Sequence, residues 1–242
     1  MAKAASRFNG GMWKHLIASF ACGLAAAAWA DGSALTDTET RWITLSWPAV
    51  AYAREQGLPL DIVVQPQPTP DNAPLAMAFI DGRCKLVLSM RGNPEAQSTL
   101  DAIPPALLKP VVEAMVAHEL GHCWRYVRGA WHTLPAGFAA SRETAPADPV
   151  LGQKLREMQD TRREEGFADL VGLAWTQRHH PERYAEVHAW FVEFRNDPSY
   201  PGSHHDTLAW IRLAPAPTAF KTADTPFDQA WPLWQQGLRA GE

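Results

Sequence analysis

The chain has 242 residues, of which 46% are hydrophobic and 20% are charged. This is an ordinary globular balance, and it excludes a disordered or fibrous protein. The formal net charge of −4 leaves no broad basic surface, so we expect no nucleic-acid partner. The length allows one domain or at most two small ones. The sequence gives no indication of an oligomeric state.

Residues 1–30 have the pattern of a secretory signal peptide. Basic residues come first, an apolar run covers Leu16 to Ala28, and small residues flank Trp29 at the expected cleavage site. The alternative is a retained membrane anchor, for which the apolar run is short. We therefore expect an exported protein, periplasmic or secreted. Its mature part is predicted to be a single domain over residues 31–242 with no transmembrane segment.

The first part of the mature chain predicts a helix and then a small sheet. Apolar residues on one face indicate a helix over 38–56, in which Pro48 is a possible kink. The expected strands are 58–65, 75–80 and 83–90. Asp81-Gly82 is a typical two-residue hairpin turn between the last two strands. Residues 93–105 are expected to form a loop.

The rest of the chain predicts helices. An apolar stripe indicates a buried helix over 105–128. Asp148, followed by Pro149, is an expected N-cap for a helix that runs to about residue 178. Further helices are expected over 181–195, 206–213 and 226–238. The order of a helix, a small sheet and then helices predicts an α+β fold, with the N-terminal sheet packed on a mostly helical core.

The motif HELGH at residues 118–122 falls inside the expected helix 105–128. Its spacing places both imidazoles, His118 and His122, on one helix face one turn apart, so they can hold one metal ion. Glu119 follows the first histidine directly and can act as general base on a metal-bound water. A coincidental match would leave these polar side chains buried without a partner, which is costly. The motif therefore predicts a zinc-peptidase centre.

A catalytic zinc ion usually has three protein ligands and one open position, so a third ligand is expected downstream. Glu165 and Asp169 lie one turn apart on the second long helix. We expect Glu165 to complete the zinc shell and Asp169 to accept the second ring N–H of a ligand histidine. Ala168 and Gly172 are small enough for this helix to pack closely on the first. The alternative is a solvated acidic face.

The pairing of HELGH with EGFADLVGL at 165–173 resembles the gluzincin zinc metallopeptidases, in particular the ExxADxxG branch. That branch includes the CAAX-prenyl-protease-like enzymes and their exported relatives, and the likeness covers about residues 105–175. It implies a minimal zincin-like domain acting on a peptide or protein substrate, with Glu119 as base and Asp169 in support. It implies one catalytic Zn²⁺ with three ligands, namely His118, His122 and Glu165. This chain lacks the transmembrane helices of many members, so a membrane-embedded substrate does not carry over.

Members of this group often have a further donor, a histidine followed by a helix with an arginine. The candidate segment here is 203–207 with Arg212. It departs from the pattern, because no proline follows the histidine and the arginine offset is loose. We favour His205 over His204 as the catalytic residue that stabilises the oxyanion of the tetrahedral intermediate. The alternative is a pair of exposed loop histidines, and Tyr126 is another candidate donor.

Two further features leave alternatives open. Cys84 and Cys123 remain after signal cleavage, and they form either a disulfide, as exported proteins often have, or two buried thiols. The expected strand 85–90 could lie at the edge of the cleft and pair with an extended substrate, by analogy with zincins as a class.

The predicted function is that of an exported zinc-dependent metallopeptidase. One alternative is a non-catalytic exported domain that binds zinc or a partner, which a fourth ligand such as His132 or a cysteine would favour. The intact Glu119 argues against a purely structural zinc site, which has no need of that carboxylate. The other alternative is a metallohydrolase that acts on a non-peptide amide.

Overall fold

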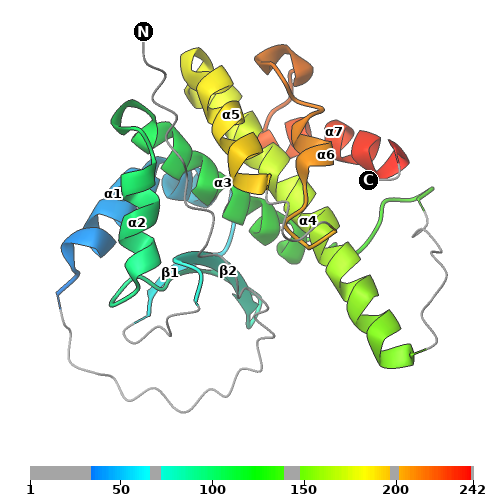
Figure 1. Cartoon of the computed structure of the whole chain (residues 1–242), viewed down its shortest axis with the longest axis horizontal. Helices are drawn as coiled ribbons and strands as arrows, with labels where there is room; N and C mark the ends of the chain where they lie inside the picture. Colours follow the sequence, from blue (N-terminus) through cyan, green and yellow to red (C-terminus); the bar gives the residue numbers. More distant parts are fainter. Residues whose placement is uncertain (1–33, 66–71, 139–147, 197–201, 241–242) are drawn as a thin grey trace, which may run out of the picture.

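The computed structural model describes residues 34–65, 72–138, 148–196 and 202–240, so the predicted signal peptide lies outside the described residues. The helices are α1 (Asp37–Glu55), α2 (Pro94–Ala102), α3 (Leu108–Val127), α4 (Pro149–His179), α5 (Tyr184–Arg195), α6 (Leu208–Ile211) and α7 (Pro226–Ala240). The strands are β1 (Leu60–Val64), β2 (Leu75–Ile80) and β3 (Arg83–Leu88). The predicted α+β fold is confirmed, because the small sheet packs on a helical core that contains the HELGH helix, α3 (Figure 1).

The first helix begins at a capping box and continues through a proline. The Thr36 side chain accepts from the backbone N–H of Glu39, and the Glu39 carboxylate accepts from the Thr36 N–H. Pro48 lies inside α1 without ending it. Trp42 and Ala49 are buried on the face that packs against the core, and this burial holds the helix together across the missing backbone hydrogen bond.

The strand order is β1-β3-β2, with β1 parallel and β2 antiparallel to β3. Asp81 and Gly82 both have positive φ, 52° and 74°, which confirms the predicted hairpin turn. The expectation that the strand 85–90 could pair with an extended substrate is wrong, because β3 has a strand partner on each side. The chain after β1 returns so that β1 and β2 each pair with one side of β3, which makes β3 the central strand. Within the described residues, β2 pairs with β3 only.

Residues 93–105, expected as a loop, contain α2. The Asn93 side chain caps its first turn and Pro94 occupies the first helical position, a combination that favours helix initiation. Ala96 and Leu100 are buried one turn apart. The apolar stripe is only two residues long, and it was too short to predict a helix without its packing partners.

Small residues let α3 and α4 approach closely, as predicted. A Cβ at Gly172 would lie 2.8 Å from the carbonyl oxygen of Ala114, and one at Gly121 would lie 3.1 Å from the Cα of Ala168. These contacts involve backbone atoms, which cannot move aside as a flexible side chain can. The close approach brings the two sequence motifs face to face.

Cys84 and Cys123 form a disulfide, with Cα atoms 5.6 Å apart. Both cysteines are fully buried. The bond joins the central strand to α3 at the residue that follows His122, so it fastens the sheet to the helix that carries HELGH. Among the described helices, none has the length and apolar composition needed to cross a bilayer.

Candidate metal centre

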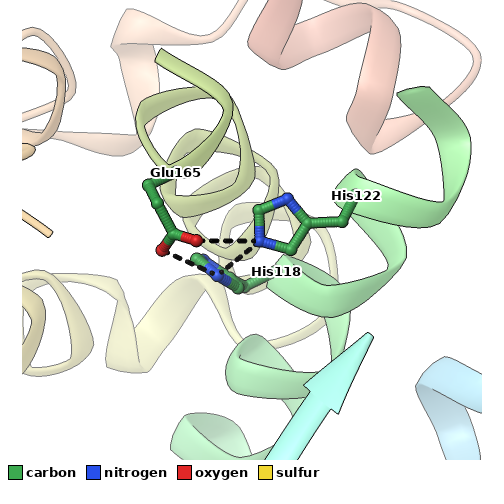
Figure 2. Close-up of side chains that lie close together, drawn as sticks. All are labelled: His118, His122 and Glu165. Atoms are coloured by element: carbon green, nitrogen blue, oxygen red, sulfur yellow. Dashed lines mark hydrogen bonds and ion pairs between the residues drawn. The ribbon is translucent and has the colours of Figure 1, made fainter. Parts of the chain in front are cut away.

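Three side chains from α3 and α4 point toward one another in the core of the fold (Figure 2). The Nε2 atoms of His118 and His122 are 3.1 Å apart. The carboxylate oxygens of Glu165 lie 3.5 Å from Nε2 of His118 and 3.3 Å from Nε2 of His122. The side chains are only 10%, 7% and 12% exposed. These residues form a largely buried group that could hold a metal ion.

The spacing of the donors fits a small tetrahedral ion. Bonds of about 2.0–2.1 Å at tetrahedral angles place neighbouring donors about 3.3 Å apart. The two Nε2 atoms are 3.1 Å apart, close to that value, and the two oxygens of Glu165 lie 3.5 Å and 3.3 Å from Nε2 of His118 and of His122, respectively. Two imidazoles with one carboxylate suit zinc and similar transition metals, whereas calcium and magnesium prefer oxygen ligands alone. The residues present therefore fit the predicted ion.

A buried polar network supports the first histidine. Oδ1 of Asp169 lies 2.8 Å from Nδ1 of His118, which leaves Nε2 to face the centre. Arg195 donates from Nε and Nη2 to Asp169, both at 2.9 Å, and from Nη2 to Glu165 at 3.2 Å. The Thr207 hydroxyl also donates to Asp169. Sequence reasoning missed Arg195, which belongs to no motif. It also missed the role of Thr207, which lies in the 203–207 segment but contacts a residue 38 positions away.

The metal-free network is strongly charged. Burial lowers the pKa of His118, but its hydrogen bonds to Asp169 and Glu165 outweigh burial and raise the pKa to about 10. Burial likewise opposes ionisation of both carboxyls. The two histidines nevertheless hold the pKa of Glu165 well below its usual value. Arg195 and His118 lower the pKa of Asp169 to about 2. A bound cation would therefore take the place of the proton on His118.

Glu119 follows His118 directly on α3. Its side chain is half-buried, and it lines the same pocket as His118 and Arg195. Burial raises the pKa of the Glu119 carboxyl, which makes the carboxylate a stronger base.

The second histidine is held differently from the first. The Trp131 ring packs edge-on against His122, with centroids 5.4 Å apart. Nδ1 of His122 has no hydrogen-bond partner among the described residues. The supporting acceptor expected for a ligand histidine is therefore present for His118 only.

One histidine of the 203–207 segment lies beside the centre, and the other packs on it. Nε2 of His205 is 3.7 Å from the Glu165 carboxylate, and the ring of His204 packs on the His205 ring with centroids 4.0 Å apart. Burial lowers the pKa of His205 to about 3, so its ring is neutral at pH 7. Arg212 is exposed just beyond the short α6. Arg195, rather than Arg212, is the arginine that reaches the centre.

The other residues considered as an oxyanion donor or a fourth ligand make contacts away from the centre. The Tyr126 ring is stacked between Phe79 and Trp131, with centroids 5.3 and 4.1 Å apart. Nε2 of His132 lies 3.2 Å from the hydroxyl of Thr161, and Cys123 is bound in the disulfide. Within the described ranges, the group that could hold a metal contains His118, His122 and Glu165 alone.

No protein-family model, no curated protein and no solved structure matches this chain. The functional argument therefore depends on the geometry of the centre and on the chemistry of its residues.

Proposed function

We propose that the protein is an exported zinc-dependent metallopeptidase. The observation that carries the proposal is the buried group of His118, His122 and Glu165, in which the nearest donor atoms of each pair lie 3.1 to 3.5 Å apart, together with Glu119, which lines a pocket with His118. A structural zinc site would have a fourth protein ligand, whereas among the described residues the group has three. When bound there, zinc supplies a Lewis acid and lowers the pKa of a water molecule.

The remaining steps belong to side chains of this chain. Glu119 accepts a proton from the attacking water and passes it to the leaving amine, and its raised pKa suits both transfers. His205 is neutral at pH 7, so its ring N–H can donate to the oxyanion of the tetrahedral intermediate. Asp169 and Arg195 do not touch the substrate in this scheme. They hold His118 and Glu165 in position.

A peptide substrate is supported by the strand beside the centre. Within the described residues, β2 has one side without a strand partner, and Leu75 at its start lines the pocket shared with His118 and Glu119. An extended peptide can add to such a sheet edge through backbone hydrogen bonds. We assign this role to β2, in place of the central strand that the sequence suggested. The buried disulfide supports export, because such bonds persist in oxidising compartments.

The test is metal content and peptide cleavage by the mature chain, residues 31–242. The wild type is expected to hold about one zinc ion, because three ligands suffice for a catalytic site. Glu165→Ala should lose the metal, whereas the matched change Glu157→Ala, at an exposed position on the same helix, should keep it. Glu119→Gln should keep the metal and lose at least about 10²-fold in rate.

Each other outcome contradicts the proposal in a distinct way. Absence of zinc after reconstitution would indicate a metal-free partner-binding domain. Stoichiometric zinc without cleavage of any peptide in a degenerate library would indicate a non-catalytic zinc domain. Cleavage of non-peptide amides alone would indicate a different hydrolase.

A further inference from the structure

The two histidines of the candidate metal centre are supported unequally. Nδ1 of His118 has the carboxylate of Asp169 at 2.8 Å, whereas Nδ1 of His122 is buried and has no hydrogen-bond partner among the described residues. An imidazole without such a bond is weakly restrained about its Cβ–Cγ bond, because that torsion has broad minima. Nε2 of His122 nevertheless points toward His118 and Glu165 (Figure 2). Another contact must therefore orient this ring.

The ring of Trp131 lies against His122. The two ring centroids are 5.4 Å apart, and the two planes are 77° apart. The His118 ring lies 4.7 Å away at 89°, so His122 meets two rings that are nearly perpendicular to its own plane. Such contacts are favourable, and they restrict rotation because a turned ring loses them. His118 is itself a candidate ligand, which leaves Trp131 as the ring that holds His122 from outside the donor group.

Trp131 is fixed by a stack of aromatic rings. It packs on Tyr126 with centroids 4.1 Å apart and planes 16° from parallel, and on its neighbour His132 at 4.9 Å and 26°. Tyr126 in turn packs on Phe79 of β2 at 5.3 Å and 5°. Tyr126 lies one turn after His122 on α3, so the stack is anchored on the helix that carries this histidine. An indole held in such a stack keeps its place beside His122.

The backbone of the loop that carries Trp131 is bound by a buried ion pair. Arg125 of α3 donates from Nε and Nη2 to the Glu164 carboxylate of α4 at 2.8 and 2.9 Å, and both side chains are 1% exposed. Oε1 of Glu164 also accepts the backbone N–H of His132, and Nη2 of Arg125 donates to the Thr133 carbonyl. A buried ion pair by itself contributes little net stability. Here it fixes the two residues after Trp131 against both helices that carry the candidate ligands.

We infer that Trp131 is the positioning residue of His122, and that packing of its ring does for the second histidine what the Asp169 carboxylate does for the first. Trp131 acts through His122 and is neither a ligand nor a catalytic residue. The inference rests on the metal-binding part of the proposed function, because it concerns how a ligand histidine is oriented. Loss of the ring should loosen His122, weaken metal binding and change the arrangement of the ligands.

The experiment measures the equilibrium binding and the visible absorption spectrum of Co²⁺ in the mature chain, residues 31–242, so that it needs no turnover. Co²⁺ occupies tetrahedral sites as zinc does, and its d–d bands respond to the arrangement of the ligands. Trp131→Leu should raise the dissociation constant for Co²⁺ about tenfold and shift these bands, because the partner that orients a ligand histidine is lost. Trp131→Phe retains a ring, so its dissociation constant should stay within about threefold of the wild-type value.

A matched control separates this effect from the general loss of a tryptophan. Trp47→Leu makes the same change on α1, where the side chain is exposed and its ring faces Arg54. It should leave both the affinity and the spectrum unchanged. Far-UV circular dichroism of the metal-free proteins shows whether each variant is folded. Trp131→Met, a second variant without a ring, takes the place of Trp131→Leu if that variant does not fold.

The outcomes separate this inference from the proposed function. An unchanged Co²⁺ affinity or an unchanged spectrum in Trp131→Leu overturns the inference. An equal loss of affinity in Trp131→Phe also overturns it, because the ring would then not be what holds His122. Each of these results leaves the metallopeptidase proposal standing, since the wild type still binds the metal. If the wild type binds neither Co²⁺ nor zinc, the proposed function itself is overturned.

Discussion

The carboxylate of Asp169 lies directly behind the ring of His118, with Oδ1 2.8 Å from Nδ1. Asp169 is fully buried, and Arg195 and Thr207 both donate to it. Because the acceptor is held from several sides, the imidazole can present only Nε2 to Glu165 and His122. Asp169 therefore determines both the orientation and the tautomer with which His118 meets a metal ion.

Loss of this carboxylate is expected to weaken metal binding. In Asp169→Asn the acceptor charge behind His118 is removed, and Arg195 keeps the carboxylate of Glu165 as its charged partner. We expect the zinc dissociation constant to rise about 10–100-fold, measured by competition with a chelator. Asp160→Asn makes the same change on the same helix at a partly exposed position and should leave the affinity unchanged. Equal affinities for the two variants would contradict a supporting role for Asp169.

Zinc affinity is expected to increase with pH. Burial opposes a charge on His118, but Asp169 and Glu165 raise its pKa to about 10 in the metal-free protein. Zinc must displace this proton, because only the neutral ring binds the metal. The association constant should therefore rise about tenfold per pH unit from about pH 6.5 to about pH 8.5. The measurement is a chelator competition series corrected for the protonation of the chelator, and a flat profile above neutral pH would contradict it.

Substitutions of the two neighbouring histidines, His204 and His205, are expected to change kcat by different amounts. His205 lies 3.7 Å from the Glu165 carboxylate, whereas His204 packs on the His205 ring. His205→Ala should lower kcat about 10²–10³-fold with unchanged zinc content, since it removes the proposed oxyanion donor and none of the three candidate ligands. His204→Ala should change kcat less than about tenfold. Comparable losses in both variants would mean that the pair acts through packing alone.

The disulfide is expected to contribute a large part of the free energy of unfolding. It closes a loop with a sequence separation of 39 residues, for which loop-closure entropy predicts about 4 kcal/mol. The double variant Cys84→Ala, Cys123→Ala should lower the free energy of unfolding in urea by about 2–4 kcal/mol. Reduction of the wild type should produce the same shift. A loss below about 1 kcal/mol would show that packing around β3 and α3 suffices without the bond.

Local patterns predicted most of the elements and the residues that form the centre. The spacing within HELGH requires only that residues 118–122 be helical, because a helix places residues four apart on one face. The N-cap at Asp148 and the turn at Asp81 and Gly82 are also local, and the structure confirms both. The α2 helix was missed because its short apolar stripe is helical mainly through packing.

Local sequence patterns could not predict the contacts between segments that are far apart in the chain. The order of the strands depends on how the chain returns after β1. As a result β3 is central, and among the described residues β2 has a strand partner on one side only. Arg195 reaches Asp169 only because α5 folds back along α4. The pocket wall of Trp190 and Phe194 comes from the same helix.

The sequence by itself therefore determined which groups this protein has available: two imidazoles and a carboxylate on one helix, and a pair of carboxylates on another. These depend on helical periodicity, which acts over one turn. Only the tertiary structure brought the nearest donor atoms to 3.1 to 3.5 Å from one another. It also placed the Arg195 side chain within hydrogen-bond distance of Asp169 and Glu165, and it formed the mostly apolar pocket that His118 lines. Those features arise from helix packing and chain return, where residues far apart in sequence meet and no periodic pattern records the contact.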